Sequence, residues 1–316
     1  MSARKGNADI WPALPFADWK ETAATLHMWT QIVGKVRLAL TPWVNHSWHI
    51  TLYVTARGLT TSPMAHGSRS FEIEFDFVEH ALLIRSSDGA QRELPLPGLS
   101  VAEFYEQLMR TLGEMNLAVE ISPSPNEVEH PTRFAEDRAH ATYDPEFANR
   151  FWRVLVQTDR VFKLFRSRFI GKCSPVHFFW GSFDLAVTRF SGRTAPRHPG
   201  GVPHLPNDVA VEAYSHEVSS AGFWPGSEAI PEAVFYSYAY PAPDGFAEAK
   251  VEPAEATWNT TLREFILPYE AVRTASAPDE LLLSFLQSTY EAAANLAQWD
   301  REALEHHGAW PGAALP

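Results

Sequence analysis

The feature that most constrains the fold of this chain is an internal repeat, in which the same residues occur twice in the same order. A single ungapped shift carries Pro12 onto Pro145 and Trp19 onto Trp152. Further pairs under the same shift are Thr25 with Thr158, Pro42 with Pro175, Leu52 with Leu185, Val54 with Val187, Thr55 with Thr188, Thr61 with Thr194 and Pro63 with Pro196. Self-similarity in a fixed order indicates a duplicated structural unit. We therefore predict two copies of one unit in tandem, packed as a pseudo-twofold pair.

The first copy, residues 1–121, has the pattern of a helix, three strands and a second helix. The first helix is predicted from Asp18, where Asp18 and Glu21 form a capping-box pattern, to Thr41-Pro42. Alternating apolar residues then predict strands at 48–55, 71–77 and 81–85. A second capping box, Ser100 with Glu103, predicts a helix from Ser100 to Gly113.

The second copy follows a proline-rich linker, residues 122–144, which has no apolar period. Asp144 as cap and Pro145 in the first turn predict a long helix. Strands are expected at 183–188, 209–218 and 233–240, and a closing helix at 278–304. The second unit is thus assigned residues 145–304, and residues 305–316 are assigned as a tail.

Together these elements predict an α+β fold built from two α-β-β-β-α units, each an antiparallel sheet with helices packed on one face. The clean alternation in the first unit indicates that the other sheet face is either wet or forms a pocket. The second copy carries extra segments at 197–208, 219–232 and 241–258, rich in Gly, Pro, His and Trp. Such insertions are where one copy of a duplicated protein would specialise.

Composition excludes several classes of protein. The net charge of −12 argues against nucleic-acid binding, which requires cations to neutralise phosphates. One cysteine, Cys173, leaves no internal disulfide and fits a reducing compartment. The first nine residues lack the apolar stretch of a secretory signal, and no run is long and apolar enough to cross a membrane. We therefore expect a soluble, cytoplasmic protein.

The densest group of chemically active side chains lies at 175–193. If Leu185 and Val187 face the core, Asp184 and Thr188 point away from it, because side chains alternate along a strand. Asp184 would then be an acid among aromatic residues, serving either as a general acid or base or as a structural ion pair. Because buried charges usually come paired, we expect Asp184 to pair with Arg189 or Arg193.

Arginines near a glycine turn suggest the charge of a ligand. Arg189, Arg193 and Arg197 surround Gly192, and arginine can hold a carboxylate or phosphate with two parallel hydrogen bonds. This favours a small anionic ligand, although a solvated loop would carry the same residues. The chain has no phosphate-binding glycine motif, so no nucleotide is indicated and the cofactor stays unknown.

The chain has 13 histidines, but none has the spacing of known metal ligands. His46 and His49 stand at a strand entry, and His198, His204 and His216 are spread over loops and a strand. We therefore expect no metal site.

Residues 214–226 form a second candidate wall. His216 could act as a base oriented by Glu217, with Ser219 or Ser220 as nucleophile, but the nucleophile elbow of serine hydrolases is absent. Phe223 to Gly226 reads better as a loop that places Trp224 over a pocket mouth, or as a core plug.

The run His177 to Asp184, the segment Thr188 to Arg193, His216-Glu217 and Phe223 to Gly226 resemble a bacterial family of proteins of similar length, described as a domain of unknown function. The resemblance would extend from about Trp11 to Trp299. It implies no activity, substrate or cofactor, and it makes an established enzyme family less expected.

Two function classes stay open. The first is a small-molecule site, binding or catalytic, in the second half near the junction of the two units. Its predicted wall consists of His177, Trp180, Asp184, Arg189, Arg193, His216, Glu217 and Trp224. The second is a non-enzymatic interaction or self-association module that uses the sheet surface, since aromatic residues are also enriched at interfaces. An exposed apolar face would favour the second class, and a closed pocket with titratable groups would favour the first.

Overall fold

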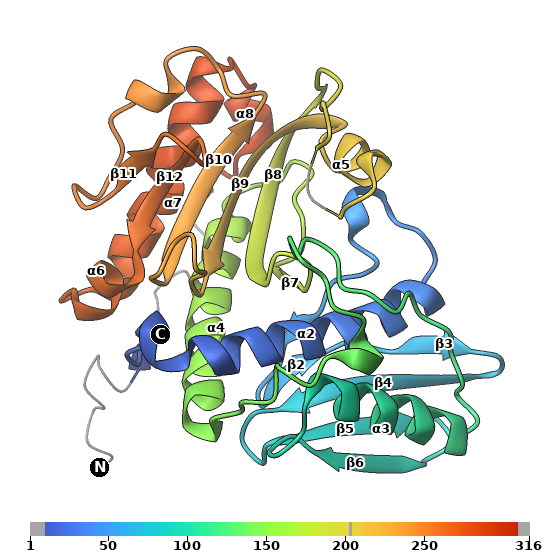
Figure 1. The fold of residues 1–316 in the computed structure, drawn as a ribbon. Coiled ribbons are helices and arrows are strands. Elements are labelled where there is room, and N and C mark those ends of the chain that lie inside the picture. The colour runs from blue at the N-terminus through green and yellow to red at the C-terminus, as the bar shows by residue number, and fades with distance from the viewer. Residues whose placement is uncertain (1–9, 202–203, 309–316) are drawn as a thin grey trace.

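The computed structural model describes residues 10–201 and 204–308. These residues form two antiparallel sheets, each six-stranded, with helices packed against them, so the fold is α+β as predicted (Figure 1). Within the described part of the chain, no helix is both long and apolar enough to cross a membrane. The predicted N-terminal stretch 1–9 and residues 309–316 of the predicted tail lie outside the described residues.

The first sheet is a meander in the order β1-β2-β4-β5-β6, with β3 paired to β4. The elements of this half are α2 (Phe16–Leu40), η1 (Asn45–Ser47), β1 (Tyr53–Val54), β2 (Gly58–Thr60), β3 (Met64–His66), β4 (Arg69–Asp76), β5 (Ala81–Ser86), β6 (Gln91–Pro95) and α3 (Val101–Glu114). The predicted capping box at the start of α3 is confirmed, because Ser100 and Glu103 cap each other. The predicted pairing of 71–77 with 81–85 is confirmed as β4 and β5.

The second sheet has the order β11-β12-β10-β9-β8-β7. The elements of this half are α4 (Pro145–Ser167), β7 (His177–Phe179), β8 (Asp184–Thr194), α5 (Asn207–Ala213), β9 (His216–Trp224), β10 (Val234–Tyr240), η3 (Phe246–Glu248), β11 (Thr257–Asn259), β12 (Glu264–Pro268), α6 (Tyr269–Thr274), α7 (Pro278–Leu296) and α8 (Arg301–Leu304). Asp144 caps α4 with its side chain, as predicted.

The helices α4 and α7 cover one face of the second sheet and leave the other face to loops and α5 (Figure 1). The covered face belongs to one large core that also includes the buried residues of the first sheet. The two sheets touch at their edges, where Leu52 and Phe178 form an isolated bridge beside β1 and β7. The open face of the second sheet carries a smaller apolar cluster of Val234, Tyr236 and Ile266.

The segment predicted as a linker, 122–144, contains one short helical turn, η2 (Phe134–Glu136), and otherwise no helix or strand. It is fastened to α2, because the Gln31 side chain donates to the Asn126 carbonyl at 2.8 Å and accepts from the Asn126 amide at 2.7 Å. The segment therefore runs as an ordered strap along the junction of the two halves, which brings Glu127 near the second sheet.

Four local predictions are wrong, each for a physical reason. The helix α2 begins at Phe16 after Pro15, so Asp18 lies in its first turn and makes no cap. Most of 48–55 is not a strand. A 3-10 turn at Asn45–Ser47, with His46 in the left-handed conformation, precedes this segment, and regular strand pairing begins only at β1. The stretch at 207–213 is the short helix α5, and β9 begins only at His216. The closing helix breaks between α7 and α8.

Each half contains a long helix, an antiparallel sheet and a later helix, but each sheet has six strands rather than the three predicted for each unit. The residue shift that carries Pro12 onto Pro145 places Leu52, which is next to β1, on Leu185 in β8. By position in the sheet, however, β1 corresponds to β7 and not to β8, because β1 and β7 are both edge strands. The internal duplication and the boundaries of the two units therefore stay predictions.

Candidate functional site

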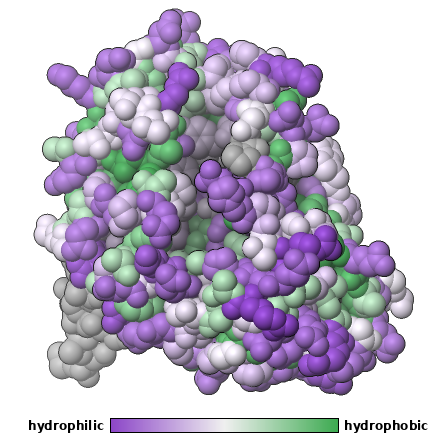
Figure 2. Space-filling model, in the orientation of Figure 1, coloured by the Kyte–Doolittle hydropathy of each residue, from purple (hydrophilic) through white to green (hydrophobic). Residues whose placement is uncertain are grey.

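A cavity of about 390 Å³ opens on the face of the second sheet that α4 and α7 do not cover. Its floor is formed by β8, β9, β10 and the start of β12, and its rim by α5, η1 and the strap residue Glu127. In Figure 2 this face of the molecule is hollowed near its middle. Pockets of about 300–1,000 Å³ are typical of small-molecule sites.

The alternation of β8 produces the central part of the floor. Asp184, Ala186, Thr188 and Phe190 line the cavity, while Leu185 lies in the main core on the opposite face. The sequence-based prediction that Asp184 and Thr188 point away from the core side of this strand is thus confirmed.

The tyrosines of β10 form the second part of the floor. Tyr236 and Tyr238 are two residues apart and both line the cavity. Tyr236 pairs in register with Gly222 of β9, and a Cβ atom at Gly222 would overlap the Tyr236 ring. The absence of a side chain at Gly222 therefore lets the Tyr236 ring lie across β9.

Asp184 is the most buried acid of the cavity wall, with 6% of its surface exposed. The Tyr236 hydroxyl donates a hydrogen bond to its Oδ2 atom. Burial raises the pKa of Asp184 to about 7, and the negative charge of Glu127 acts in the same direction. The carboxyl can therefore hold or release a proton near neutral pH, as a general acid or base must.

Two further carboxyls face the same cavity. Burial raises the pKa of Glu264 to about 7, with the charge of Asp184 adding to the effect. Burial also raises the pKa of Glu127, against a hydrogen bond at 2.8 Å from the Ser182 hydroxyl that lowers it. Among the described residues, none of these three carboxyls forms an ion pair with a lysine or arginine. The wall is acidic and lacks a counterion of its own.

At the rim by η1, His46 is held as a neutral imidazole. Its Nδ1 atom lies 3.1 Å from the Ala213 carbonyl, which can only accept, so Nδ1 carries the proton. Its Nε2 atom accepts from Lys172 Nζ at 2.6 Å. Burial, with the nearby Lys172 charge, lowers the pKa of His46. The backbone amide of His46 donates to the Glu212 carboxylate, which ties η1 to α5.

Aromatic rings complete the cavity. Besides the two β10 tyrosines, the ring-bearing side chains that line it are Trp48, Phe179, Phe190, Tyr214 and Trp224. The Tyr214 and Tyr238 hydroxyls lie 3.0 Å apart, and the Thr188 and Ser220 hydroxyls 2.9 Å apart. The site thus combines apolar rings with a few fixed hydroxyl and carboxyl groups.

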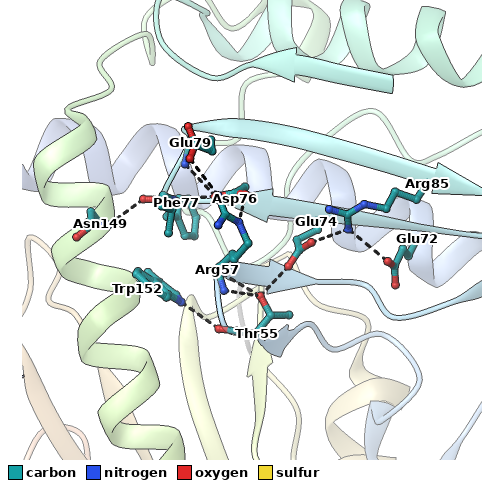
Figure 3. A network of polar contacts seen from close by, with 12 residues as sticks. Thr55, Arg57, Glu72, Glu74, Asp76, Phe77, Glu79, Arg85, Asn149 and Trp152 are labelled. Atoms are coloured by element: carbon teal, nitrogen blue, oxygen red, sulfur yellow. Dashed lines mark hydrogen bonds and ion pairs between the residues drawn. The ribbon is translucent and has the colours of Figure 1, made fainter. Parts of the chain in front are cut away.

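The first sheet carries acids in a contrasting arrangement (Figure 3). Asp76 accepts from Arg57 Nε at 2.5 Å, and Glu74 accepts from Arg85 Nη1 at 2.7 Å. The Arg57 guanidinium and two backbone amides hold the pKa of Asp76 below its usual range despite burial. The buried acids of the first sheet are therefore neutralised within the protein, whereas those of the cavity are not.

The expected partners of Asp184 prove to be elsewhere. Arg189 lies on the opposite face of β8, fully buried between the rings of Phe165 and Tyr290. Arg193 is half-exposed and pairs with Glu217 at 2.6 Å. The prediction that an arginine pairs with Asp184 is wrong. Side chains alternate along β8, so Arg189 points to the core face and Asp184 to the cavity face, and Arg193 lies beyond the bulge that follows Phe190. Arg197 is also absent from the cavity lining, so the arginines do not support an anionic ligand at this cavity.

Of the eight predicted wall residues, Asp184 and Trp224 line the cavity. Trp180 is buried over Gly34, where its indole N–H donates to the Ile50 carbonyl at 2.8 Å. His177 is fully buried next to Trp48 and Phe179. The remaining four, Arg189, Arg193, His216 and Glu217, are absent from the lining. The His216 Nδ1 atom lies 3.1 Å from the hydroxyl of its neighbour Ser215, whereas the Ser220 hydroxyl pairs with Thr188, so the predicted pairing of His216 with Ser220 does not form.

Sequence reasoning missed Glu127, Tyr236, Tyr238, Glu264 and His46 as wall residues. Two signals could have found some of them. The run Val234 to Tyr240 alternates tyrosines with other residues, which places Tyr236 and Tyr238 on one face of a strand. Glu264 lies in the segment Arg263 to Pro268, which begins with the same Arg-Glu pair and ends with the same Leu-Pro pair as the segment Arg92 to Pro97 of the first half. Glu127 and His46 gave no local signal, since tertiary folding of the strap and of η1 brings them here.

No group of three or more His, Cys, Asp or Glu side chains is arranged to hold a metal ion in residues 10–201 and 204–308. The side chains of the cavity supply hydroxyl donors, carboxyl groups and aromatic faces. This set can bind a small organic molecule and can exchange a proton with it.

The fold and the cavity define an α+β protein with a ligand-sized cavity on the open face of its second sheet. The chain belongs to the family of unknown function DUF5996, which matches residues 11–306. The sequence-based resemblance to a family of unknown function is thereby confirmed over the whole predicted range, from Trp11 to Trp299. No curated protein and no solved structure matches the chain.

Proposed function

We propose that this protein binds a small molecule in the cavity of the second sheet. The observation that carries the proposal is the convergence of aromatic rings and buried titratable groups, Asp184 among them, in a cavity of about 390 Å³. Apolar pockets with a few fixed polar groups and perturbed acids are the usual form of binding and active sites.

The hydroxyl pairs support this function because they fix the polar groups in place. Tyr236 orients Asp184, Tyr214 and Tyr238 contact each other, and Glu212 anchors α5 over the opening through His46. Such preorganisation lowers the entropic cost of ligand binding. If the ligand is also converted, the groups that would donate or accept a proton are Asp184 and Glu264, because both line the cavity and burial raises the pKa of each to about 7.

The alternative, an interaction module, depends on a broad exposed apolar surface. The large apolar side chains most exposed in the described ranges are Ile10, Leu38, Trp43, Val44, Val78, Ile170 and Leu296, and these come from separate elements except around the end of α2. Neighbouring Leu38, Trp43 and Val44 form a small group. This support is weaker than that for the cavity, so we rank self-association second.

The proposed function is tested by asking what the purified protein carries. The protein is denatured, and the released small molecules are analysed by mass spectrometry. A Thr188→Phe variant places a large ring in the cavity from a half-buried position of β8. Thr194→Phe, at the exposed end of the same strand, is the matched control. A compound retained by the wild type and by the control, and lost from Thr188→Phe, is expected. Equal content in all three proteins would contradict the proposal.

A further inference from the structure

We propose that the ligand of this cavity is a small organic cation, an amine whose ammonium group is held against Asp184 and Glu264. The inference rests on the proposed function and names its ligand class. It replaces the anionic ligand that the arginine pattern suggested, since Arg189 and Arg193 lie outside the cavity wall.

The first observation is the charge of the groups that face the cavity from each element around it. Asp184 comes from β8, Glu264 from β12 and Glu127 from the strap, and all three are acids. The titratable residues that face it from the other elements are His46 of η1, Tyr214 at the end of α5, and Tyr236 and Tyr238 of β10. His46 is neutral and points its Nε2 atom at Lys172. A ligand would therefore meet negative or neutral groups.

The second observation is the absence of an internal counterion for a deeply buried acid. Asp184 lines the cavity with 6% of its surface exposed. Its carboxyl group accepts a hydrogen bond from the neutral hydroxyl of Tyr236. A buried carboxyl group stays ionised at little cost only when it is paired with a cation, and otherwise it takes up a proton. In the first sheet Arg57 and Arg85 fulfil this role for Asp76 and Glu74. At Asp184 the position of such a cation falls inside the cavity, where a ligand ammonium would stand.

The third observation is the kind of wall that surrounds these acids. Aromatic faces attract ammonium groups by about 0.5–1 kcal/mol at exposed sites and by about 2 kcal/mol when the site is desolvated. Tyr236, which contacts Asp184, is stacked with Tyr238 at a distance of 6.2 Å between ring centroids, and Trp224 lies in the same wall. Carboxyl groups among aromatic rings are suited to an amine that also has an apolar part.

The test uses three probes of the same shape and different charge: 2-phenylethylamine, 2-phenylethanol and phenylacetate. Binding to the full-length protein is measured by isothermal titration calorimetry. The amine is expected to bind at least about tenfold more tightly than either analogue. Its affinity is also expected to rise about tenfold from about pH 6 to about pH 8, as the ionised fraction of a carboxyl with a pKa near 7 increases. Asp184→Asn should abolish the preference for the amine.

The outcomes separate the ligand class from the site. If 2-phenylethanol or phenylacetate binds more tightly than the amine, and this binding is lost in Thr188→Phe, the inference of a cationic ligand would be overturned. The cavity would still be the binding site. Amine binding that persists in Thr188→Phe would place the amine elsewhere and overturn the inference, while the comparison of retained compounds would still decide the proposed function. Failure of the amine to bind at millimolar concentration to a wild-type protein shown to be folded by its thermal transition would also overturn the inference.

Discussion

Tyr236 reaches across a whole strand to donate its hydroxyl hydrogen to Asp184. The two residues lie on β10 and β8, and β9 runs between them. The contact is possible because Gly222, the β9 residue paired with Tyr236, has no side chain in the way. The acid is thereby oriented by a neutral donor, which leaves its charge unbalanced when it ionises. Several properties of the protein depend on this difference from an ordinary ion pair.

Asp184→Asn is expected to leave the free energy of unfolding unchanged or to raise it by about 1 kcal/mol at about pH 8. The amide oxygen can still accept from Tyr236, and no charge has to be buried. The matched control is Asp76→Asn, which weakens the contact to Arg57 and should cost about 1–3 kcal/mol. Urea unfolding of both variants and the wild type measures the difference. A large loss of stability in Asp184→Asn would reveal a structural partner for this acid.

The advantage of Asp184→Asn over the wild type should depend on pH in a defined direction. Burial raises the pKa of Asp184 from 3.8 to about 7, so the folded protein keeps a proton there that the unfolded chain releases. The stabilisation from this proton is complete below about pH 4 and is lost as the pH rises through 7. The variant's advantage should therefore grow between about pH 4 and about pH 7 and then level off. Melting temperatures measured in pairs at each pH check this.

The comparison in pairs matters because other buried groups titrate with the opposite sign. Burial lowers the pKa of His177 to about 3 and that of His27 to about 4. These neutral histidines add stability at neutral pH that is lost as the pH falls. They are present in both proteins, so their effect cancels in the difference. A difference that shrinks with rising pH would show that Asp184 is ionised in the folded state at low pH.

The strands and helices that the sequence predicts well are those specified by local patterns. The cap at Asp144, the capping box at Ser100 and Glu103, and the alternation at 71–77 are each determined by neighbouring residues. The failures occur where distant contacts override the pattern. Residues 48–52 alternate like a strand, but the left-handed turn at His46 and its contacts with Glu212 and Ala213 hold this segment on the cavity rim.

The site was predictable as far as alternation determines it. The face of Asp184 followed from its own strand, and the same rule applied to Arg189 would have placed this arginine in the core. The partner of Asp184 was not predictable, because Tyr236 lies 52 positions further along the chain and comes close only through the pairing of three strands. Glu127 likewise reaches the cavity only because its strap is fastened to α2.

Arg189 should tolerate an apolar replacement better than a lysine. Its guanidinium carbon lies 3.5 Å from the centroid of the Phe165 ring and 4.3 Å from that of Tyr290. Two of its nitrogens have no hydrogen-bond partner in the part of the chain that the structure describes. Lysine cannot stack in this way and is more strongly hydrated, so Arg189→Lys should cost about 2–4 kcal/mol. Arg189→Met should cost less. Arg193→Met, on the surface, is the control and should change stability by about 1 kcal/mol or less. Equal losses for Lys and Met would contradict the stacking argument.

His177→Phe is expected to stabilise the protein by about 1–2 kcal/mol. Both ring nitrogens of His177 are buried and have no hydrogen-bond partner among the described residues, and phenylalanine keeps the ring beside Phe179. The affinity for 2-phenylethylamine should stay within about twofold of the wild type, since His177 does not line the cavity. Unfolding curves and calorimetry measure the two effects. Loss of stability together with loss of probe binding would instead assign His177 to the site.

Gly222→Ala tests whether the position of the Tyr236 ring determines the site. The added methyl group would overlap the ring, so Tyr236 must shift towards the cavity and its contact with Asp184 must break. We expect a loss of about 1–3 kcal/mol in stability and at least about tenfold weaker binding of 2-phenylethylamine. Gly113→Ala in α3 is the control, because nothing lies near the added methyl there, and it should raise stability by about 0.5–1 kcal/mol.

A double variant separates the clash from a general weakness of β9. The double variant combines Gly222→Ala with Tyr236→Leu. The leucine side chain is shorter than the tyrosine ring that it replaces and leaves room for the methyl group added at position 222. The two changes should therefore cost less together than the sum of their separate costs, with a coupling energy of about 1 kcal/mol or more. Probe binding should stay weak in the double variant, because Asp184 has lost its donor. Additive costs would show that the Gly222 methyl does not act through the Tyr236 ring.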